Sequence, residues 1–213
     1  IIANCKKEIL LLDCSTIDLE TVVKLNSVCL SKGLNFLDAP VSGGTIGADN
    51  CTLTFMVGGD EVSFKSLSPL FNAMGSKAVY CGKSGSGQIA KLCNNMLLAI
   101  TMIGVSESFN MAKNLKLDLN ILFDVISTAT GSCWAINNYC PIPGVGPESP
   151  ADNNYSAGFS AKLMSKDLKI AVNAGEKSNS NINFGLLAEE LFTKMANGVN
   201  SEKDFSAIIK EIH

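Results

Sequence analysis

Residues 8–13 read Glu8-Ile-Leu-Leu-Leu-Asp13, a short continuous apolar run that is typical of a strand buried on both faces. Asp18 can cap a helix that we expect to run to about Lys32, and Gly33 should end that helix. The run Asn35-Phe-Leu-Asp38 then predicts a second brief strand. A strand, a helix and a strand in this order indicate a parallel α/β sheet.

Two more strands and one more helix complete the α/β part of the sequence. The pattern predicts a strand over Thr52–Val57, a helix from about Glu61 to Met74, and a strand over Ala78–Tyr80. Residues 39–44 contain one proline and two glycines, and we expect them to form a loop.

A long helix is predicted over about residues 87–113, followed by a series of helices. Its uncharged run, Leu92–Ser106, is shorter than the 18 or more residues expected of a membrane span, so we interpret it as a buried core helix. Helical periodicity returns in residues 119–130, 160–174, 184–197 and about 204–212, with an irregular Pro/Gly-rich loop at 139–155. The second half of the chain should therefore be all-helical.

Composition argues against several classes of protein. The formal net charge is −3 and Lys+Arg number 17, which gives no sign of a nucleic-acid-binding surface, and we expect no membrane association. The eight cysteines form no CxxC pair, and the single histidine is His213, so metal-site spacing is missing and we expect no metal. Most of the cysteines look like small buried side chains in a reducing compartment.

Lys91 is the first candidate for chemistry, because it stands at the polar end of a long apolar segment. Taken alone, the segment more simply indicates a surface lysine whose stem lies along apolar surface with the charged end in water. Asn94 and Asn95 fall on the same helical face, and Gly85 and Gly87 let the backbone approach a ligand closely. Partial burial lowers the pKa of a lysine, and a lysine with a lowered pKa can exchange a proton with the hydroxyl of a substrate. Asn95 offers a donor and an acceptor to the same oxygen.

Three further segments could belong to a site. Asp13-Cys-Ser-Thr16 lies at the carboxyl end of a parallel strand, where open α/β sheets bind ligands, although Ser15 or Thr16 could simply cap a helix. Ser42-Gly43-Gly44 offers consecutive backbone N–H groups to an anion such as a carboxylate. Phe159 precedes the adjacent pair Lys166-Asp167, and the simplest interpretation of that segment is a solvated helix face.

Together these segments resemble the 3-hydroxyisobutyrate dehydrogenase family within the β-hydroxyacid dehydrogenases. The matching stretches are Asp13–Ile17, Asp38–Gly44, Leu53–Gly59, Gly87–Ile100 and Leu163–Leu168. The resemblance implies part of a Rossmann-type, dinucleotide-binding parallel sheet in residues 1–84. It implies an all-helical domain in residues 85–213, joined to the sheet by the long interdomain helix.

The resemblance also implies a role for each candidate residue and a reaction. Lys91 would be catalytic, Ser42, Gly43, Gly44 and Asn95 would bind substrate, Thr16 and Lys166 would bind NAD, and Phe159 and Asp167 would line the cleft. The implied reaction is the reversible, NAD-dependent oxidation of 3-hydroxyisobutyrate to methylmalonate semialdehyde in valine catabolism, with NADP left open. A homodimer or homotetramer is expected, in the mitochondrial matrix of a eukaryote or the cytoplasm of a bacterium.

One departure concerns the family's opening βαβ unit, whose GxGxxG turn binds the pyrophosphate. That motif is absent, and Gly82, Gly85 and Gly87 have a different spacing and precede the long helix. We therefore expect the sequence to begin partway through the dinucleotide-binding domain. These 213 residues alone are expected to bind NAD weakly and to be inactive.

Two alternatives to this function stay open. Sister reductases act on tartronate semialdehyde, glyoxylate or succinic semialdehyde, although Asn94-Asn95 and Trp134–Pro143 resemble the hydroxyisobutyrate branch more closely. The alternative of another class is a non-catalytic relative that keeps the fold as a binding or oligomerisation module. Lys91 and the lack of a basic tract argue against it.

Overall fold

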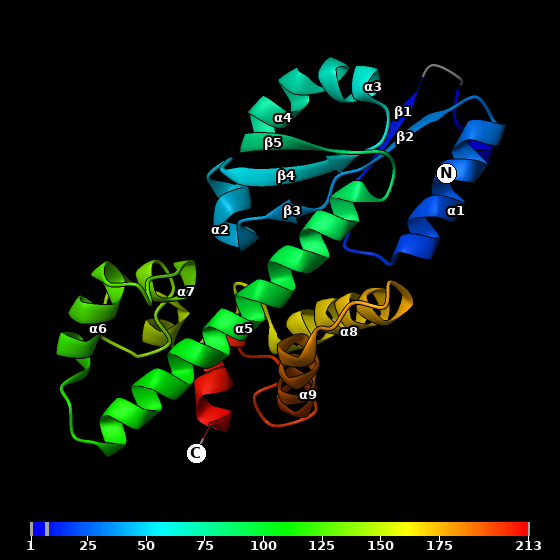
Figure 1. The fold of residues 1–213 in the computed structure, drawn as a ribbon. Coiled ribbons are helices and arrows are strands. Elements are labelled where there is room, and N and C mark those ends of the chain that lie inside the picture. Colours follow the sequence, from blue (N-terminus) through cyan, green and yellow to red (C-terminus); the bar gives the residue numbers. More distant parts are fainter. Residues whose placement is uncertain (1, 7–8, 213) are drawn as a thin grey trace. The chain divides into compact units, whose positions relative to one another are not determined.

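Residues 2–6 and 9–212 are described by a computed structural model (Figure 1). The chain forms two compact units, Ile1–Asn94 and Asn95–His213. The first unit contains the sheet and the second is helical. The boundary between the units falls inside the longest helix, α5 (Ser86–Asn114), which the sequence predicted to within one residue at each end.

The sheet of the first unit is mixed. Its strands are β1 (Leu10–Asp13), β2 (Asn35–Asp38), β3 (Val41–Ser42), β4 (Leu53–Gly58) and β5 (Gly75–Gly82). β1 pairs with β2 and β4 pairs with β5 in parallel, which confirms the predicted parallel pairing for these strands. β4 is antiparallel to β3, and it is also antiparallel to β2, where Asp38 pairs with Gly58.

The antiparallel strands follow from a short connection that the sequence analysis took for a simple loop. Residues 43–52 contain the six-residue helix α2 (Gly44–Asp49), whereas a parallel crossover needs about a dozen residues or more. The chain therefore reverses direction after Ser42 and returns as β4 beside β3. The expectation of a loop over residues 39–44 is corrected, since β3 and the start of α2 lie there.

Helices cover both faces of this sheet, because neighbouring side chains on a strand point to opposite faces. On one face, Val22 and Cys29 of α1 (Leu19–Ser31) pack in a cluster with Phe36 of β2. On the other face, Leu37 of β2 packs in a cluster with Phe71 of α4 (Ser68–Met74), and α3 (Glu61–Ser66) adds to this layer. The buried core of the unit is therefore divided between two faces.

The segment expected to form one helix over 61–74 is two helices, α3 and α4. Leu67 ends α3, and Pro69 occupies the first turn of α4. Proline has no backbone N–H and fits the first turn of a helix better than its interior. The break therefore occurs where the proline sets the start of a new helix.

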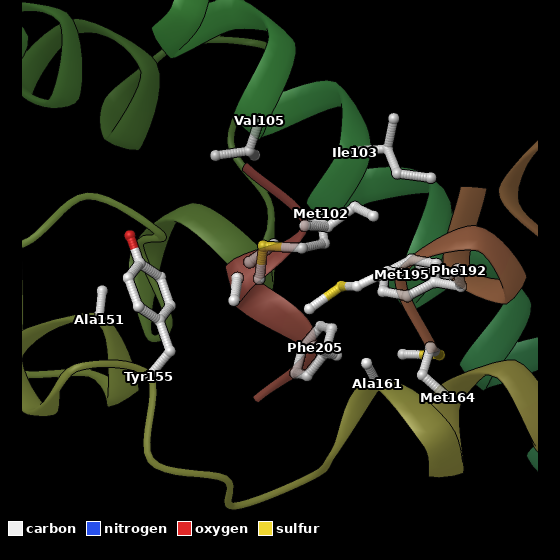
Figure 2. Packing of buried hydrophobic residues seen from close by; sticks show 14 of the residues in the cluster. Met102, Ile103, Val105, Ala151, Tyr155, Ala161, Met164, Phe192, Met195 and Phe205 are labelled. Atoms are coloured by element: carbon white, nitrogen blue, oxygen red, sulfur yellow. The ribbon is translucent and has the colours of Figure 1, made fainter. Parts of the chain in front are cut away.

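The second unit is built around one hydrophobic cluster. Its remaining helices are α6 (Leu119–Thr128), α7 (Trp134–Asn137), α8 (Ala161–Lys177), α9 (Asn183–Ala196) and the 3-10 helices η2 (Pro150–Asn153) and η3 (Phe205–Glu211), while η1 (Ile2–Asn4) belongs to the first unit. Figure 2 shows Met102, Met164, Phe192, Met195 and Phe205 converging in this cluster. The unit is all-helical, as predicted.

Helix α5 is long and apolar enough, by length and composition, to cross a membrane, but a core helix passes the same test. Met102 and Phe109 are fully buried in the cluster of the second unit, which supports the core interpretation. Burial is not complete around the helix, since Leu97 is 61% exposed and Met111 is 62% exposed. The expectation that neighbours would bury this helix all round is corrected.

Candidate functional site

The segment after β1 carries Thr16, the residue expected to contact the dinucleotide. Asp13 at the end of β1 accepts a 2.9 Å hydrogen bond from the N–H of Ser15. The helix that follows is capped by Asp18, whose Oδ1 accepts from the N–H of Thr21 at 2.9 Å. Because Asp18 occupies the N-cap, the alternative that Ser15 or Thr16 caps this helix is wrong.

Lys91 lies in the second turn of α5 and is only 8% exposed. A surface lysine with its charged end in water would expose much more of its side chain. The structure therefore argues against the surface-lysine alternative. A lysine buried at the start of a helix in this way is a candidate for proton transfer to a bound ligand.

The start of α5 is held by the strands of its own unit. Asp38 at the end of β2 is fully buried, and its carboxylate accepts hydrogen bonds from the N–H groups of Gly85 (2.7 Å) and Gln88 (3.1 Å). A Cβ atom on Gly87 would stand 2.8 Å from the carbonyl oxygen of Asp38 and would also collide with that of Met56. Gly87 thus permits close approach of protein backbone, and the approach of a ligand to Gly85 and Gly87 stays a prediction.

Gln88 is a residue of this region that sequence reasoning did not single out. Its side chain is fully buried, and its Nε2 donates to the carbonyl oxygen of Ser15 at 2.7 Å. Its Oε1 accepts from the N–H of Ile17 at 3.2 Å. The available signal was an amide side chain three residues before Lys91, which by itself indicates no partner.

Ser42 ends β3, Gly43 follows it, and Gly44 begins α2. Ser42 pairs with Thr54 of β4, and the two glycines adopt φ angles of 134° and 63°. These angles lie in the region that favours glycine, and both residues are exposed. The segment therefore presents accessible backbone at an unusual turn, which is compatible with the expected binding of an anion.

Asn95, in the second unit, is directly bonded to another predicted residue. Its Nδ2 donates to Oδ2 of Asp167 on α8 at 2.7 Å, and these two residues are each 2% exposed. The other carboxylate oxygen of Asp167 lies 3.2 Å from Nζ of Lys166, whose side chain is about half exposed, in an ion pair. The interpretation of this part of α8 as a solvated helix face is therefore wrong for Asp167.

Phe159 is held by a second residue that the sequence analysis missed. Oδ2 of the fully buried Asp204 accepts from the N–H of Phe159 at 3.0 Å and from the hydroxyl of Tyr139 at 3.0 Å. The rings of Phe159 and Tyr139 both pack on Phe205, with centroid distances of 6.0 and 5.4 Å. Burial, and then the charge of Asp204, raise the pKa of the Tyr139 hydroxyl far above its ordinary value.

The predicted residues are thus divided between the two units. Thr16, Ser42–Gly44 and Lys91 lie in the first, and Asn95, Phe159, Lys166 and Asp167 lie in the second. Lys91 and Asn95 are one turn apart on the same helix, on either side of the boundary. Within residues 2–6 and 9–212, the structure places no three His, Cys, Asp or Glu side chains where they could hold a metal ion.

Two family models match the chain. The model described as "NAD-binding of NADP-dependent 3-hydroxyisobutyrate dehydrogenase" matches residues 85–212. The model described as "NAD binding domain of 6-phosphogluconate dehydrogenase" matches residues 1–82. Nearly the whole sequence is therefore similar to NAD-binding domains of known families.

Individual relatives agree with this assignment. The chain is 45% identical to mitochondrial 3-hydroxyisobutyrate dehydrogenase of Drosophila melanogaster over 95% of its own length, but spans only 62% of that protein. It is 42% identical to a probable 3-hydroxyisobutyrate dehydrogenase of Mycobacterium tuberculosis, covering 98% of this chain and 71% of the relative. The solved structure of Mycobacterium tuberculosis 3-hydroxyisobutyrate dehydrogenase with L-serine has a TM-score of 0.94 at 42% identity, covering 99% of this chain and 72% of that one. The chain belongs to the 3-hydroxyisobutyrate dehydrogenase family.

Proposed function

We propose that the protein is an NAD-dependent 3-hydroxy acid dehydrogenase that reversibly oxidises 3-hydroxyisobutyrate to methylmalonate semialdehyde, a step of valine catabolism. The observation that carries the proposal is the buried Lys91, placed one helical turn before the buried Asn95. Membership of the family and the names of its relatives support the same substrate. The proposal concerns the whole protein, and the chain spans less than two thirds of the fly relative.

Lys91 is proposed as the catalytic residue. Its Nζ would exchange a proton with the hydroxyl oxygen of the substrate, and in its charged form it would stabilise negative charge that develops on that oxygen. Such an electrostatic contribution is larger in a buried site than in water. The low exposure of Lys91 therefore suits both roles.

Asn95 is proposed to orient the same oxygen. The hydrogen bond from its Nδ2 to Asp167 fixes the plane of its amide, because the acceptor is itself buried on another helix. An amide held in this way can align a hydroxyl or carbonyl group without first losing rotational freedom. Asp167 and Phe159 are proposed to line the cleft around the substrate.

The remaining roles concern the two ligands. Ser42, Gly43 and Gly44 are proposed to bind the substrate carboxylate, which is supported by the exposed backbone of the two glycines. Thr16 follows β1, whose final residue pairs in parallel with Asp38 of β2, and the carboxyl ends of such strands are where α/β sheets bind dinucleotides. Thr16 and Lys166 are proposed to hold NAD, with NADP as an alternative; when bound, the nicotinamide supplies the hydride acceptor.

The test measures the effect of Lys91→Ala in the full-length product of the gene. We expect kcat for oxidation of 3-hydroxyisobutyrate to fall by roughly 10²–10⁴-fold in Lys91→Ala, the range usual for loss of acid–base catalysis. Lys83→Ala, which removes an exposed lysine just before α5, is the control and should retain its rate. Hydride transfer at nearly the original rate in Lys91→Ala would overturn the catalytic role.

Two alternatives are decided by related measurements. Faster turnover of glycerate or 4-hydroxybutyrate than of 3-hydroxyisobutyrate would assign the protein to a sister reductase. Absence of turnover with each of these acids and either dinucleotide would favour a non-catalytic binding or oligomerisation module. The division at residues 84 and 85 into a dinucleotide-binding and an all-helical domain also stays a proposal.

Self-association is proposed from the surface of α6. None of its residues is buried, although it carries Ile121 and Val125, which are 55% and 56% exposed. One face of α6 packs against the cluster of the second unit through Leu119, Leu122, Phe123 and Ile126. Single exposed apolar residues are ordinary, but Ile121 and Val125 stand one turn apart on the other side of the helix, and neighbouring exposed apolar residues suggest contact with a partner. We propose a homodimer or homotetramer.

A mitochondrial location in a eukaryote, or a cytoplasmic one in a bacterium, is proposed because the fly and human relatives are named as mitochondrial.

A further inference from the structure

Gln88 links the first turns of α5 to the segment that follows β1. Its Nε2 donates to the carbonyl oxygen of Ser15 at 2.7 Å, and its Oε1 accepts from the N–H of Ile17 at 3.2 Å. These two backbone groups flank Thr16. One planar amide therefore binds the chain on both sides of the residue proposed to contact the dinucleotide.

The backbone that carries Gln88 is fixed independently of its side chain. The N–H of Gln88 donates to Oδ2 of Asp38, and the N–H of Gly85 donates to Oδ1 of the same carboxylate. Asp38 ends β2, while Ser15 and Ile17 follow β1. The start of α5 is thus bonded to the end of β2 and to the segment that follows its neighbour β1, and Lys91 lies three residues further along the same helix.

We propose that Gln88 is a positioning residue, which holds Thr16 in place against the part of α5 that carries Lys91. The inference rests on the proposed function, because Thr16 and Lys91 acquire their roles there. A neutral amide suits this position, since it offers a donor to a carbonyl oxygen and an acceptor to an N–H within one rigid group. A carboxylate would face the carbonyl oxygen of Ser15 with a second acceptor, and an apolar side chain would bind neither group.

The test uses Gln88→Met, which keeps the length of the side chain and removes both hydrogen bonds. Loss of two hydrogen bonds of ordinary strength should raise KM for NAD by about tenfold or more and change kcat by at most about threefold. Amide hydrogen exchange at Ile17 should become about tenfold faster. Ser106→Ala is the matched control, because Ser106 is also fully buried on α5 and donates to the carbonyl oxygen of Met102.

Gln88→Glu separates hydrogen bonding from a general packing defect. Near pH 8 its carboxylate would repel the carbonyl oxygen of Ser15, while the protonated acid at lower pH would again donate to it. Because the side chain at this position is fully buried, burial should raise the pKa of the new acid. We expect KM for NAD in Gln88→Glu to approach that of the unsubstituted protein as the pH falls to about 6, with no such recovery in Gln88→Met.

The outcomes distinguish this inference from the proposed function. If the unsubstituted protein oxidises the hydroxy acid but Gln88→Met keeps KM for NAD within about twofold, the positioning role alone is overturned. If the unsubstituted protein does not oxidise the hydroxy acid, the proposed function fails. In that case, unchanged amide hydrogen exchange at Ile17 in Gln88→Met overturns the positioning role as well. Faster exchange at Ile17 instead supports Gln88 as the residue that holds the backbone of residues 15–17.

Discussion

Asn95 on α5 and Asp167 on α8 are joined by a 2.7 Å hydrogen bond between two buried side chains, although 72 residues separate them in the sequence. The carboxylate of Asp167 also pairs with Lys166, so the contact connects two residues proposed to bind substrate and cofactor. A charged acceptor makes such a bond stronger than one between neutral groups. Asp167 therefore has a role that reaches beyond lining a cleft.

Replacing Asp167 with Ala should reduce both stability and substrate binding. The Nδ2 of Asn95 loses its buried acceptor, which should cost about 1–3 kcal/mol in the free energy of unfolding, measured with urea. KM for the hydroxy acid should rise because the amide is no longer held. Glu202→Ala is the control, since it removes an exposed ion pair with Lys162 and should change stability by about 1 kcal/mol or less. Equal stability of the two variants would contradict the buried bond.

Two glycines on α5 should respond in opposite ways to alanine. Gly87→Ala places a Cβ 2.8 Å from the carbonyl oxygen of Asp38, and forcing atoms into such a packed contact typically costs about 1–3 kcal/mol. Gly104 has no heavy atom within 4 Å of the added Cβ, so Gly104→Ala should stabilise the helix by about 1 kcal/mol. Thermal and urea unfolding of both variants measure the difference. Destabilisation by Gly104→Ala would show that the surface of α5 at this point is covered in solution.

Tyr139 should make the stability of the protein depend on alkaline pH. Its folded-state pKa is raised by burial and by Asp204, so an unfolded tyrosine loses its proton near pH 10 while the folded one keeps it. The stability that this group contributes is complete below about pH 10 and is lost as the pH rises further. Tyr139→Phe lacks this effect.

The measurement is the difference in unfolding free energy between the unsubstituted protein and Tyr139→Phe, taken with urea at about pH 8 and about pH 11. At about pH 8 the unsubstituted protein should be more stable than Tyr139→Phe, because the hydroxyl of Tyr139 donates a hydrogen bond to Asp204. The difference should shrink toward the higher pH by up to about 1.4 kcal/mol for each unit above 10. A difference that stays constant would contradict the prediction.

Charge on the exposed side of α6 should disrupt self-association. Ile121→Glu places a carboxylate on a surface that is 55% exposed, so the fold of the subunit should tolerate it while a dimer or tetramer contact there should not. Light scattering after size exclusion gives the mass. Val62→Glu on α3, where Val62 is 75% exposed, is the control and should leave the mass unchanged. An unchanged mass in both variants would place the contact elsewhere.

Local signals made much of the fold predictable from the sequence. The helix α1 was foreseen from Asp18 at its start and Gly33 after its end, and both act through neighbouring backbone. The two-residue strand β3 was not foreseen, because a strand this short is defined by its pairing with β4. The separation of α3 from α4 was signalled by Pro69, whose effect on the helix was underestimated.

The candidate site was only partly predictable for the same reason. Lys91 and Asn95 stand out in the sequence because they are polar in an apolar helix, and the structure buries both, while their roles stay proposals. Gln88 gives no local signal, and Asp204 gives only that of a helix cap, which accepts from the N–H of Ser206. The partners of Gln88 lie 71 and 73 residues away, and those of Asp204 include Tyr139 at a separation of 65. Hydrogen bonds between residues so far apart in the sequence depend on the folded arrangement, and no local sequence pattern indicates them.

Helix α5 is continuous from Ser86 to Asn114, although the boundary between the two compact units passes through it between Asn94 and Asn95. Lys91 and Asn95 are separated by one turn of this unbroken helix, so their advance along the helix axis is about 6 Å. The proposed proton-transfer residue and the proposed orienting residue therefore keep a fixed mutual spacing. A ligand that binds one of these two side chains therefore meets the other at a distance set by the helix alone, because one unbroken stretch of backbone carries both.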